Sequence, residues 1–204
     1  MTVGILALQG AVREHAAVLE SLGRSVRPVR KPDDLVGLEA LVLPGGESTA
    51  IARLASPSGL LTAIRGFVDR GFPVFGTCAG LILLADDVAD PAALAGYATI
   101  GGLNVTVRRN AFGAQLASGE AEVSLVGPAA RPSDPREGAA PSSGTMRGVF
   151  IRAPRIERVG AGVEVIAVRG DEPVAVRQGS VVACTFHPEL VPDPTLHRLW
   201  LGGV

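Results

Sequence analysis

The sequence is poor in cysteine and in net charge of either sign. Its two cysteines, Cys78 and Cys184, could form at most one disulfide among 204 residues. A secreted fold held by several disulfides is therefore excluded, and a reducing compartment is expected. The formal net charge is −1, so no strong field favours nucleic acid or an anionic membrane as a partner.

Long apolar runs and aromatic residues are also scarce. No stretch approaches the roughly 20 apolar residues that a membrane-spanning helix requires. The first residues lack a basic segment ahead of their short apolar run, so no signal peptide is expected. The sequence thus predicts a cytoplasmic protein that does not cross a membrane. Because 47% of the residues are hydrophobic but only 4% are aromatic, the core must consist mainly of Val, Leu, Ile and Ala.

The first half of the chain alternates between strand and helix patterns. Apolar runs that predict buried strands occur at 3–8, 40–43 and 73–75, and a candidate second strand lies at 25–29. Helical spacing follows at 11–22, near Ser48, at 60–70 and at 79–85. Such β–α alternation predicts a doubly wound, mostly parallel sheet, with functional residues beyond the carboxyl ends of its strands. Pro28 makes the second strand short or places it at the sheet edge.

The second half has a different pattern. Strand-like segments joined by short polar turns predict antiparallel additions to the same sheet, and they lie at 103–108, 120–126, 149–152, 163–168, 174–177 and 181–186. A last helix is expected at 195–201. The stretch 127–144, rich in Pro, Ala, Gly and Ser, is interpreted as a flexible loop insertion. We expect one domain over residues 1–204.

One motif with chemical potential is Gly-Thr-Cys-Ala-Gly at residues 76–80. It connects a predicted strand to a predicted helix, as in the nucleophile elbow of hydrolases, with Cys78 where those enzymes place serine. A cysteine at a helix N-terminus lies near the positive end of the helix dipole, which stabilises the nucleophilic thiolate. The alternative is that Cys78 is a small buried apolar residue, and the motif alone does not decide between the two. Cys184, in the middle of a predicted strand, is expected in the core.

A second motif lies far downstream, at His187-Pro188-Glu189. A cysteine nucleophile requires a base, and a carboxylate can orient that base. Side chains two residues apart in extended chain point to the same side, so His187 and Glu189 could converge near Cys78. The alternative is a surface histidine beside a proline turn. The remaining histidines, His15 and His197, are expected to be exposed or to pack between helices.

A third motif is Pro-Gly-Gly-Glu-Ser at residues 44–48. Two glycines after a buried strand leave backbone N–H groups free to bind the oxyanion that forms when an amide carbonyl is attacked. The alternative is an ordinary strand-to-helix turn with Ser48 as the helix N-cap. One turn could serve both purposes.

Together these motifs resemble the class I, or triad, glutamine amidotransferases. Within that class the chain resembles most closely the PdxT family, the glutaminase subunit of pyridoxal 5′-phosphate synthase. The resemblance spans nearly the whole chain in six blocks, at 8–15, 44–49, 75–81, 109–113, 149–154 and 186–190. It implies a flavodoxin-like three-layer α/β fold.

The resemblance also implies a set of functional residues. Cys78 would be the nucleophile, His187 the base and Glu189 its orienting acid, with backbone N–H groups of Gly46 and Ala79 as oxyanion donors. Whether Arg108 or Arg109 contacts glutamine stays open from the motif, although Arg109 is the closer match. The remaining glutamine contacts implied by the family are Gly46, Glu47, Ser48, Ile151 and Arg152.

The function implied by the resemblance is hydrolysis of L-glutamine to L-glutamate and ammonia. The ammonia would pass to a PdxS-type synthase subunit for pyridoxal 5′-phosphate synthesis, within a large hetero-oligomer. No cofactor or metal is expected, because the reaction requires neither and the chain has no Cys/His cluster at metal-ligand spacing. The alternatives are a glutaminase of another amidotransferase, a degenerate assembly or regulatory subunit, and a stand-alone cysteine hydrolase.

Overall fold

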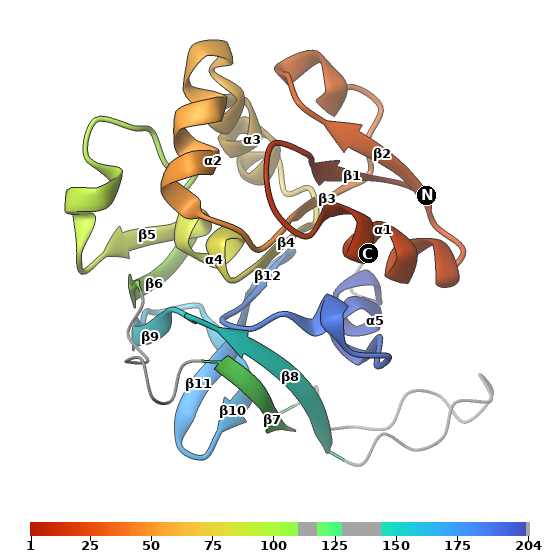
Figure 1. Ribbon diagram of the computed structural model, residues 1–204, viewed down its shortest axis with the longest axis vertical. Coiled ribbons are helices and arrows are strands. Elements are labelled where there is room, and N and C mark those ends of the chain that lie inside the picture. Colours follow the sequence, from red (N-terminus) through yellow and green to blue (C-terminus); the bar gives the residue numbers. More distant parts are fainter. Residues whose placement is uncertain (110–117, 128–143, 203–204) are drawn as a thin grey trace.

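The computed structural model describes residues 1–109, 118–127 and 144–202. Its first half confirms the predicted alternation of strands and helices (Figure 1). The elements are β1 (Thr2–Leu6), α1 (Val12–Ser21), β2 (Ser25–Val29), β3 (Ala40–Leu43), α2 (Ser48–Ala55), α3 (Leu60–Asp69), β4 (Val74–Thr77) and α4 (Ala79–Leu84). Short 3-10 helices lie at Pro32–Leu35 (η1) and Ser56–Ser58 (η2).

Within the described ranges, nine strands form one sheet in the order β2-β1-β3-β4-β12-β11-β10-β7-β8. The five strands from β2 to β12 are parallel. The remaining strands pair antiparallel, which confirms the mixed sheet expected from the second half. As Pro28 predicted, β2 is an edge strand. The later strands are β7 (Ser118–Leu125), β8 (Thr145–Ile151), β10 (Glu164–Arg169), β11 (Glu172–Gln178) and β12 (Val181–Cys184).

Helices cover both faces of the parallel strands and give three layers (Figure 1). Successive side chains of a strand point to opposite faces. Leu41 and Leu43 of β3 accordingly join the buried cluster with α2, α3 and α4, whereas Val42 joins the cluster with α1 and α5 (Thr195–Leu201). Burial on both faces explains why these strands are continuous apolar runs. The last helix has the predicted bounds.

One expectation for the second half is wrong. The strand expected at 103–108 does not extend the central sheet; as β6 (Leu103–Arg108) it lies between β5 (Ala85–Val88) and β9 (Arg155–Val159) in a separate three-stranded sheet. Its apolar side chains alternate with polar ones, which fits a sheet with one covered face and does not specify which sheet the strand joins. The strands β5 and β9, rich in charged residues, were not predicted.

Two further findings complete the fold. Among the helices that the structure describes, none is long and apolar enough to cross a membrane. The loop predicted at 127–144 falls outside the described residues except for its two terminal glycines.

Candidate active site

Three turns meet where the central parallel strands end. The register aligns Leu43 of β3 with Gly76 of β4, and Thr77 of β4 with Cys184 of β12. Beyond these pairs, the Cys78 N–H donates a hydrogen bond of 2.9 Å to the Cys184 carbonyl. All three sequence motifs therefore leave the sheet at the same edge, where functional residues of doubly wound sheets are expected.

Cys78 occupies the turn between β4 and α4 in a conformation that is rare for a residue with a side chain. Its φ is 47° and its ψ is −97°, and the residue is only 6% exposed. The flanking glycine Gly80 is required by close packing, because a Cβ there would lie 2.1 Å from the Leu43 carbonyl oxygen. Strain of this kind persists where the surrounding structure enforces it, and it is common at functional sites. Ala79 begins α4, so its N–H belongs to the first turn, where N–H groups have no partner within the helix.

His187 and Glu189 lie side by side after β12. His187 Nδ1 is 2.7 Å from Glu189 Oε1, and the Glu189 side chain is fully buried. The His187 N–H donates a 2.8 Å hydrogen bond to the Val149 carbonyl of β8, which fixes the backbone of this turn. Pro188 starts the short 3-10 helix η6 (Pro188–Leu190), and this helix brings the Glu189 carboxylate back to the imidazole.

The protonation of His187 follows from its surroundings. Burial acts to lower the pKa of His187, but hydrogen bonds to Cys78 and Glu189, together with the charges of these two groups, outweigh burial and raise the pKa to about 10. His187 is therefore an imidazolium at neutral pH. A cysteine sulfur, an imidazolium and a buried carboxylate in this order supply a nucleophile, a proton donor and an orienting group.

The glycine turn after β3 packs directly on this trio. A Cβ on Gly45 would lie 2.2 Å from His187 Cε1, so only glycine allows the close approach. The Gly45 N–H donates to Thr77 Oγ1 at 2.9 Å. The turn is also tied to the loop after β1, since the Glu47 N–H donates to Gln9 Oε1 at 2.6 Å. The backbone that carries Gly46 is thus held beside the imidazole, where an oxyanion donor is needed.

Glu47, and not Ser48, caps helix α2. Its carboxylate accepts hydrogen bonds from the N–H groups of Thr49 (3.0 Å) and Ala50 (2.7 Å). Burial acts to raise the pKa of Glu47, but these hydrogen bonds lower it overall. Ser48 is instead the first helical residue, and it is buried. The cap is therefore one residue before Ser48, the residue considered in the alternative interpretation of this turn, because the longer carboxylate reaches both free N–H groups.

The two candidate arginines have different surroundings. Arg108 forms an ion pair with Glu157 on the surface. The Arg109 side chain is only 11% exposed and extends toward Glu47, with 3.5 Å between Nη2 and Oε1. Its buried Nη1 has no hydrogen-bond partner among the described residues. An unsatisfied guanidinium nitrogen beside the glycine turn favours Arg109 as the residue that would bind a substrate carboxylate.

Ile151 and Arg152 reach the site from β8. Val149 of this strand forms a β-bridge with His187, so the end of the strand lies close to the trio. Ile151 is 41% exposed, and Arg152 adopts a positive φ of 44°. The structure thus places these two candidates at the rim of the site rather than in its interior.

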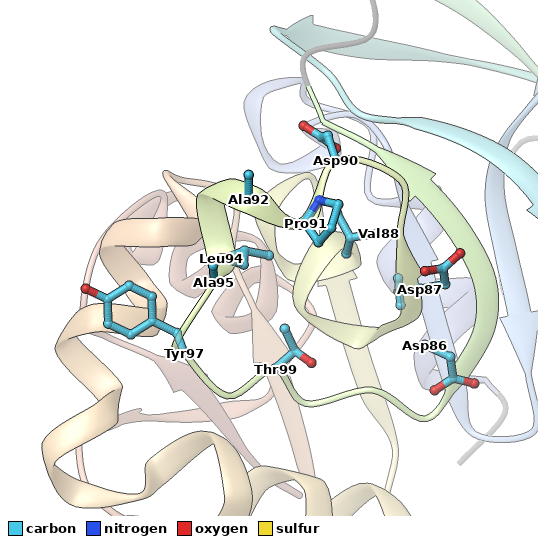
Figure 2. A pocket seen from close by; sticks show the side chains of 11 residues that line it. Asp86, Asp87, Val88, Asp90, Pro91, Ala92, Leu94, Ala95, Tyr97 and Thr99 are labelled. Carbon is cyan, nitrogen blue, oxygen red and sulfur yellow. The ribbon is translucent and has the colours of Figure 1, made fainter.

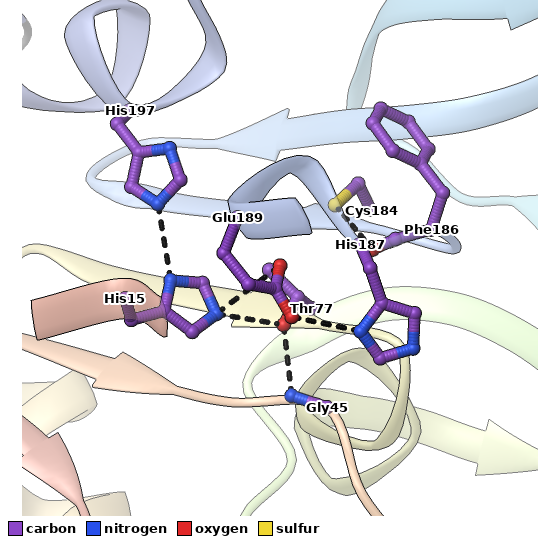
Figure 3. A network of polar contacts seen from close by, with 8 residues as sticks. All are labelled: His15, Gly45, Thr77, Cys184, Phe186, His187, Glu189 and His197. Atoms are coloured by element: carbon purple, nitrogen blue, oxygen red, sulfur yellow. Dashed lines mark hydrogen bonds and ion pairs between the residues drawn. The ribbon is translucent and has the colours of Figure 1, made fainter. Parts of the chain in front are cut away.

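The sequence interpretation missed part of the site. His15 and His197 are both fully buried, and they extend a polar network behind Glu189 (Figure 3). His15 Nε2 lies 3.4 Å from Glu189 Oε2 and 3.2 Å from Thr77 Oγ1. The helical spacing from Val12 to His15 and on to Leu19 places His15 on the buried face of α1, and this signal could have excluded exposure. Cys184 is buried in the core as predicted, and burial raises the pKa of its thiol.

A separate pocket of about 560 Å³ opens between β5 and the 3-10 helix η3 (Pro91–Leu94) (Figure 2). None of the candidate residues is among the described residues that line it. Its carboxylates serve structure: Asp86 accepts from the Gly102 N–H and Asp90 from the Arg109 N–H. Over the ranges that the structure describes, no group of His, Cys, Asp and Glu is arranged to hold a metal ion.

Comparisons with known proteins agree with this geometry. A model of the SNO glutamine amidotransferase family matches residues 5–201. The pyridoxal 5′-phosphate synthase subunit PdxT of Streptomyces coelicolor is 48% identical over 202 residues, covering 99% of this chain and 93% of that protein. PdxT of a Parafrankia species is 49% identical over 199 residues, covering 98% and 91%. A crystal structure of a glutamine amidotransferase aligns with a TM-score of 0.84 at 45% identity, covering 98% of this chain and 97% of that one.

Proposed function

The chain belongs to the SNO glutamine amidotransferase family, and we propose that it hydrolyses L-glutamine to L-glutamate and ammonia through a thioester on Cys78. The observation that carries this proposal is the buried trio at the end of the parallel strands. Cys78 lies in a strained turn at a helix N-terminus, its side chain raises the pKa of His187, and His187 Nδ1 lies 2.7 Å from Glu189 Oε1. This arrangement fits nucleophilic attack on an amide carbonyl.

Glutamine would bind between the glycine turn and the rim residues. The partly unsatisfied guanidinium of Arg109 would pair with the α-carboxylate of the substrate, a bidentate match that lysine could not reproduce. The nearby Glu47 carboxylate would accept from the α-ammonium group. We assign the remaining contacts to Gly46, Ser48, Ile151 and Arg152, which surround the same edge of the sheet.

In the first chemical step, the Cys78 thiolate attacks the side-chain amide carbon of glutamine. The carbonyl oxygen becomes an oxyanion, which the N–H groups of Gly46 and Ala79 would stabilise. His187 donates its proton to the amide nitrogen, the C–N bond breaks, and ammonia leaves. The γ-glutamyl group stays on Cys78 as a thioester.

In the second step, water replaces ammonia. The now neutral His187 takes a proton from the water, and the resulting hydroxide attacks the thioester carbonyl. The C–S bond breaks to release glutamate and restore the Cys78 thiolate beside an imidazolium. Glu189 keeps the imidazole in one orientation through both steps, since it accepts from Nδ1 throughout.

The ammonia produced here would pass to a PdxS-type synthase subunit that makes pyridoxal 5′-phosphate. This assignment rests on the PdxT proteins of Streptomyces coelicolor and Parafrankia, which are named as subunits of that synthase and match almost the whole chain. We place the reaction in the cytoplasm, where the two cysteines, both unpaired, would stay reduced. A glutaminase serving another synthase would share the same chemistry and differ only in its partner.

The decisive experiment measures glutamate release from glutamine by the protein alone and with a PdxS-type synthase added. A large increase on addition supports both the reaction and the partner. Full activity without the partner would favour a stand-alone hydrolase. Absence of activity in both conditions would favour a degenerate subunit, and a pull-down would then test whether the partner binds at all.

Replacing Cys78 tests the chemistry directly. Cys78→Ala should lower glutamate release with the synthase present by at least about 10⁴-fold, because no other thiol can form the thioester. The variant should still fold and bind the synthase, which thermal unfolding and the pull-down would check. Cys184→Ser is the matched control, since that cysteine is in the core and its replacement should leave turnover largely intact. A Cys78→Ala variant with normal turnover would overturn the assignment.

A further inference from the structure

Behind the trio lies a chain of buried polar groups that the reaction as proposed does not use. His197 Nε2 of α5 lies 3.0 Å from His15 Nδ1 of α1. On the other side of its ring, His15 Nε2 faces both Thr77 Oγ1 and Glu189 Oε2 (Figure 3). Glu189 Oε2 is fully buried and accepts no hydrogen bond from the described residues, and His15 Nε2 faces it at 3.4 Å. The network thus reaches the one carboxylate oxygen that His187 does not contact.

Burial determines the charge of both distal histidines. Burial lowers the pKa of His15 well below its ordinary value, and the neighbouring His197 and His187 lower it further. Burial likewise lowers the pKa of His197 to about 4. Both rings are therefore neutral at neutral pH, and each carries one N–H. The contact of His15 with Glu189 is accordingly that of a neutral donor and not an ion pair.

The available partners select one arrangement of protons. If His15 carried its proton on Nδ1, it would donate to His197 Nε2, and the His197 proton would sit on Nδ1, a buried atom without a partner among the described residues. The lone pair of His15 Nε2 would then face the Glu189 carboxylate. Both consequences are unfavourable, because buried donors need acceptors and lone pairs repel anions. The alternative has His197 Nε2–H donating to His15, and His15 Nε2–H donating toward Thr77 and Glu189.

We propose that His15 is a positioning residue of the glutaminase site, whose Nε2–H donates to the hydroxyl of Thr77 and faces the free oxygen of Glu189. This inference rests on the proposed glutaminase function. Thr77 Oγ1 also accepts from the Gly45 N–H, so the same network fixes the glycine turn that carries the proposed oxyanion donor. One donor on α1 therefore helps to fix the position of the Glu189 carboxylate, which orients His187, and of the glycine turn, whose backbone would bind the oxyanion.

A positioning role for His15 predicts different effects of substitution from those expected if the ring only filled space. A histidine that only fills space could be replaced by any side chain of similar shape. His15 must instead offer a donor at the Nε2 position. In His15→Gln the amide nitrogen lies near that position, whereas the shorter side chain of His15→Asn reaches only the Nδ1 side. Asparagine is one methylene shorter than glutamine, so the two variants differ in whether they reach Glu189 and Thr77.

The test measures kcat and KM for glutamate release, with a PdxS-type synthase present, across a range of pH. His15→Asn should lower kcat by roughly 10-fold or more with little change in KM, and His15→Gln should recover most of it. The alkaline limit of kcat should move to lower pH in His15→Asn, because a loosely held Glu189 stabilises the His187 imidazolium less. Loss of packing alone would not move this limit.

Thr77 provides an independent variant if His15→Asn does not fold. Thr77→Val is nearly isosteric and removes only the hydroxyl, whereas Thr77→Ser retains it. The valine variant should lose kcat about as strongly as His15→Asn, and the serine variant should not. The double variant should lose less than the product of the two single effects, since both act through one network. Ile64→Val, on the buried face of α3, is the control for a general loss of stability.

The outcomes separate this inference from the proposed function. Glutamate release by the unchanged protein, together with folded His15→Asn and Thr77→Val variants that match it in kcat and pH profile, would overturn the positioning role alone. Absence of glutamate release by the unchanged protein with its synthase would overturn the function, and the inference with it. A donor-dependent loss of kcat, recovered by glutamine and serine, would support both.

Discussion

The charge of Glu189 matters because its carboxylate is buried and lies 2.7 Å from His187 Nδ1. Glu189→Gln keeps the shape of the side chain but replaces an anion with a neutral amide. The pKa of His187, raised to about 10 by Cys78 and Glu189 despite burial, should then fall toward its ordinary value of 6.5. Since the imidazolium donates the proton to ammonia, kcat should drop by roughly 10²- to 10⁴-fold.

The raised pKa of His187 determines how the effect of Glu189→Gln on stability should change with pH. A histidine whose pKa is raised in the folded state stabilises the fold below its unfolded pKa, and this contribution is lost as pH rises through the folded value of about 10. Glu189→Gln should therefore lower stability most at and below about pH 6.5, with the effect fading toward pH 10, and should move the alkaline limit of activity to lower pH. Urea unfolding and kcat measured across pH would test both effects. Glu189→Asp, which keeps the charge, should retain more of each, and an unchanged profile in Glu189→Gln would contradict the orienting role.

At the scale of single residues, sequence motifs predicted Cys78, His187 and Glu189 but not the buried residues that contact these three. Cys78, His187 and Glu189 lie within short motifs whose spacing carries chemical meaning, and the structure brings them together. His15 and Thr77 contact this trio from different elements, and their polar contacts are made across long sequence separations. Local sequence indicates that such residues are buried, but it does not specify which group they face.

At the scale of elements, helix α2 depends on the Glu47 cap. Glu47→Ala would remove the acceptor for two N–H groups of the first turn and should lower the free energy of unfolding by about 1 kcal/mol. It should also raise the KM for glutamine, because Glu47 lies beside Arg109. Urea unfolding and steady-state kinetics would measure the two effects. Glu47→Asp, a good cap with a shorter reach, should recover stability more than KM, and equal recovery would contradict a separate role in binding.

The elements themselves were predictable where burial on both faces imposed a simple pattern. The bounds of β3 and α5 agree with those expected from an apolar run and helical spacing, and those of β2 agree although its burial is only partial. The strands β5 and β9 were missed because charged residues occupy much of each, and pairing with β6 is what makes them strands. Strand existence is encoded locally when a strand is fully buried, whereas the choice of sheet depends on tertiary contacts.

At the scale of the whole molecule, the two ends of the chain meet on one face of the sheet. Helix α1 follows the first strand and α5 is the last helix, yet both pack in the same buried cluster, where His15 and His197 face each other. The cluster also includes Phe75, whose ring contacts both His197 and Trp200. The proposed site therefore depends on the packing of the first and last helices on this face, because His15 of α1 faces Glu189 and His197 of α5 lies against His15.

Burial of His15 and His197 predicts a loss of stability in mild acid. A histidine whose folded pKa is lowered stabilises the fold above its unfolded pKa, and the contribution is lost as pH falls through 6.5 toward the folded value. For His197, with a folded pKa of about 4 against 6.5, the loss is roughly 3 kcal/mol at about 1.4 kcal/mol per pH unit, and His15 adds to it. Carboxylates with lowered pKa, such as Glu47, lose their contribution to stability only below pH 4.5.

The free energy of unfolding in urea should thus fall between pH 7 and pH 4.5. His197→Gln, which cannot titrate, should flatten that slope, whereas an equally steep slope in the variant would show that the pair does not control acid stability.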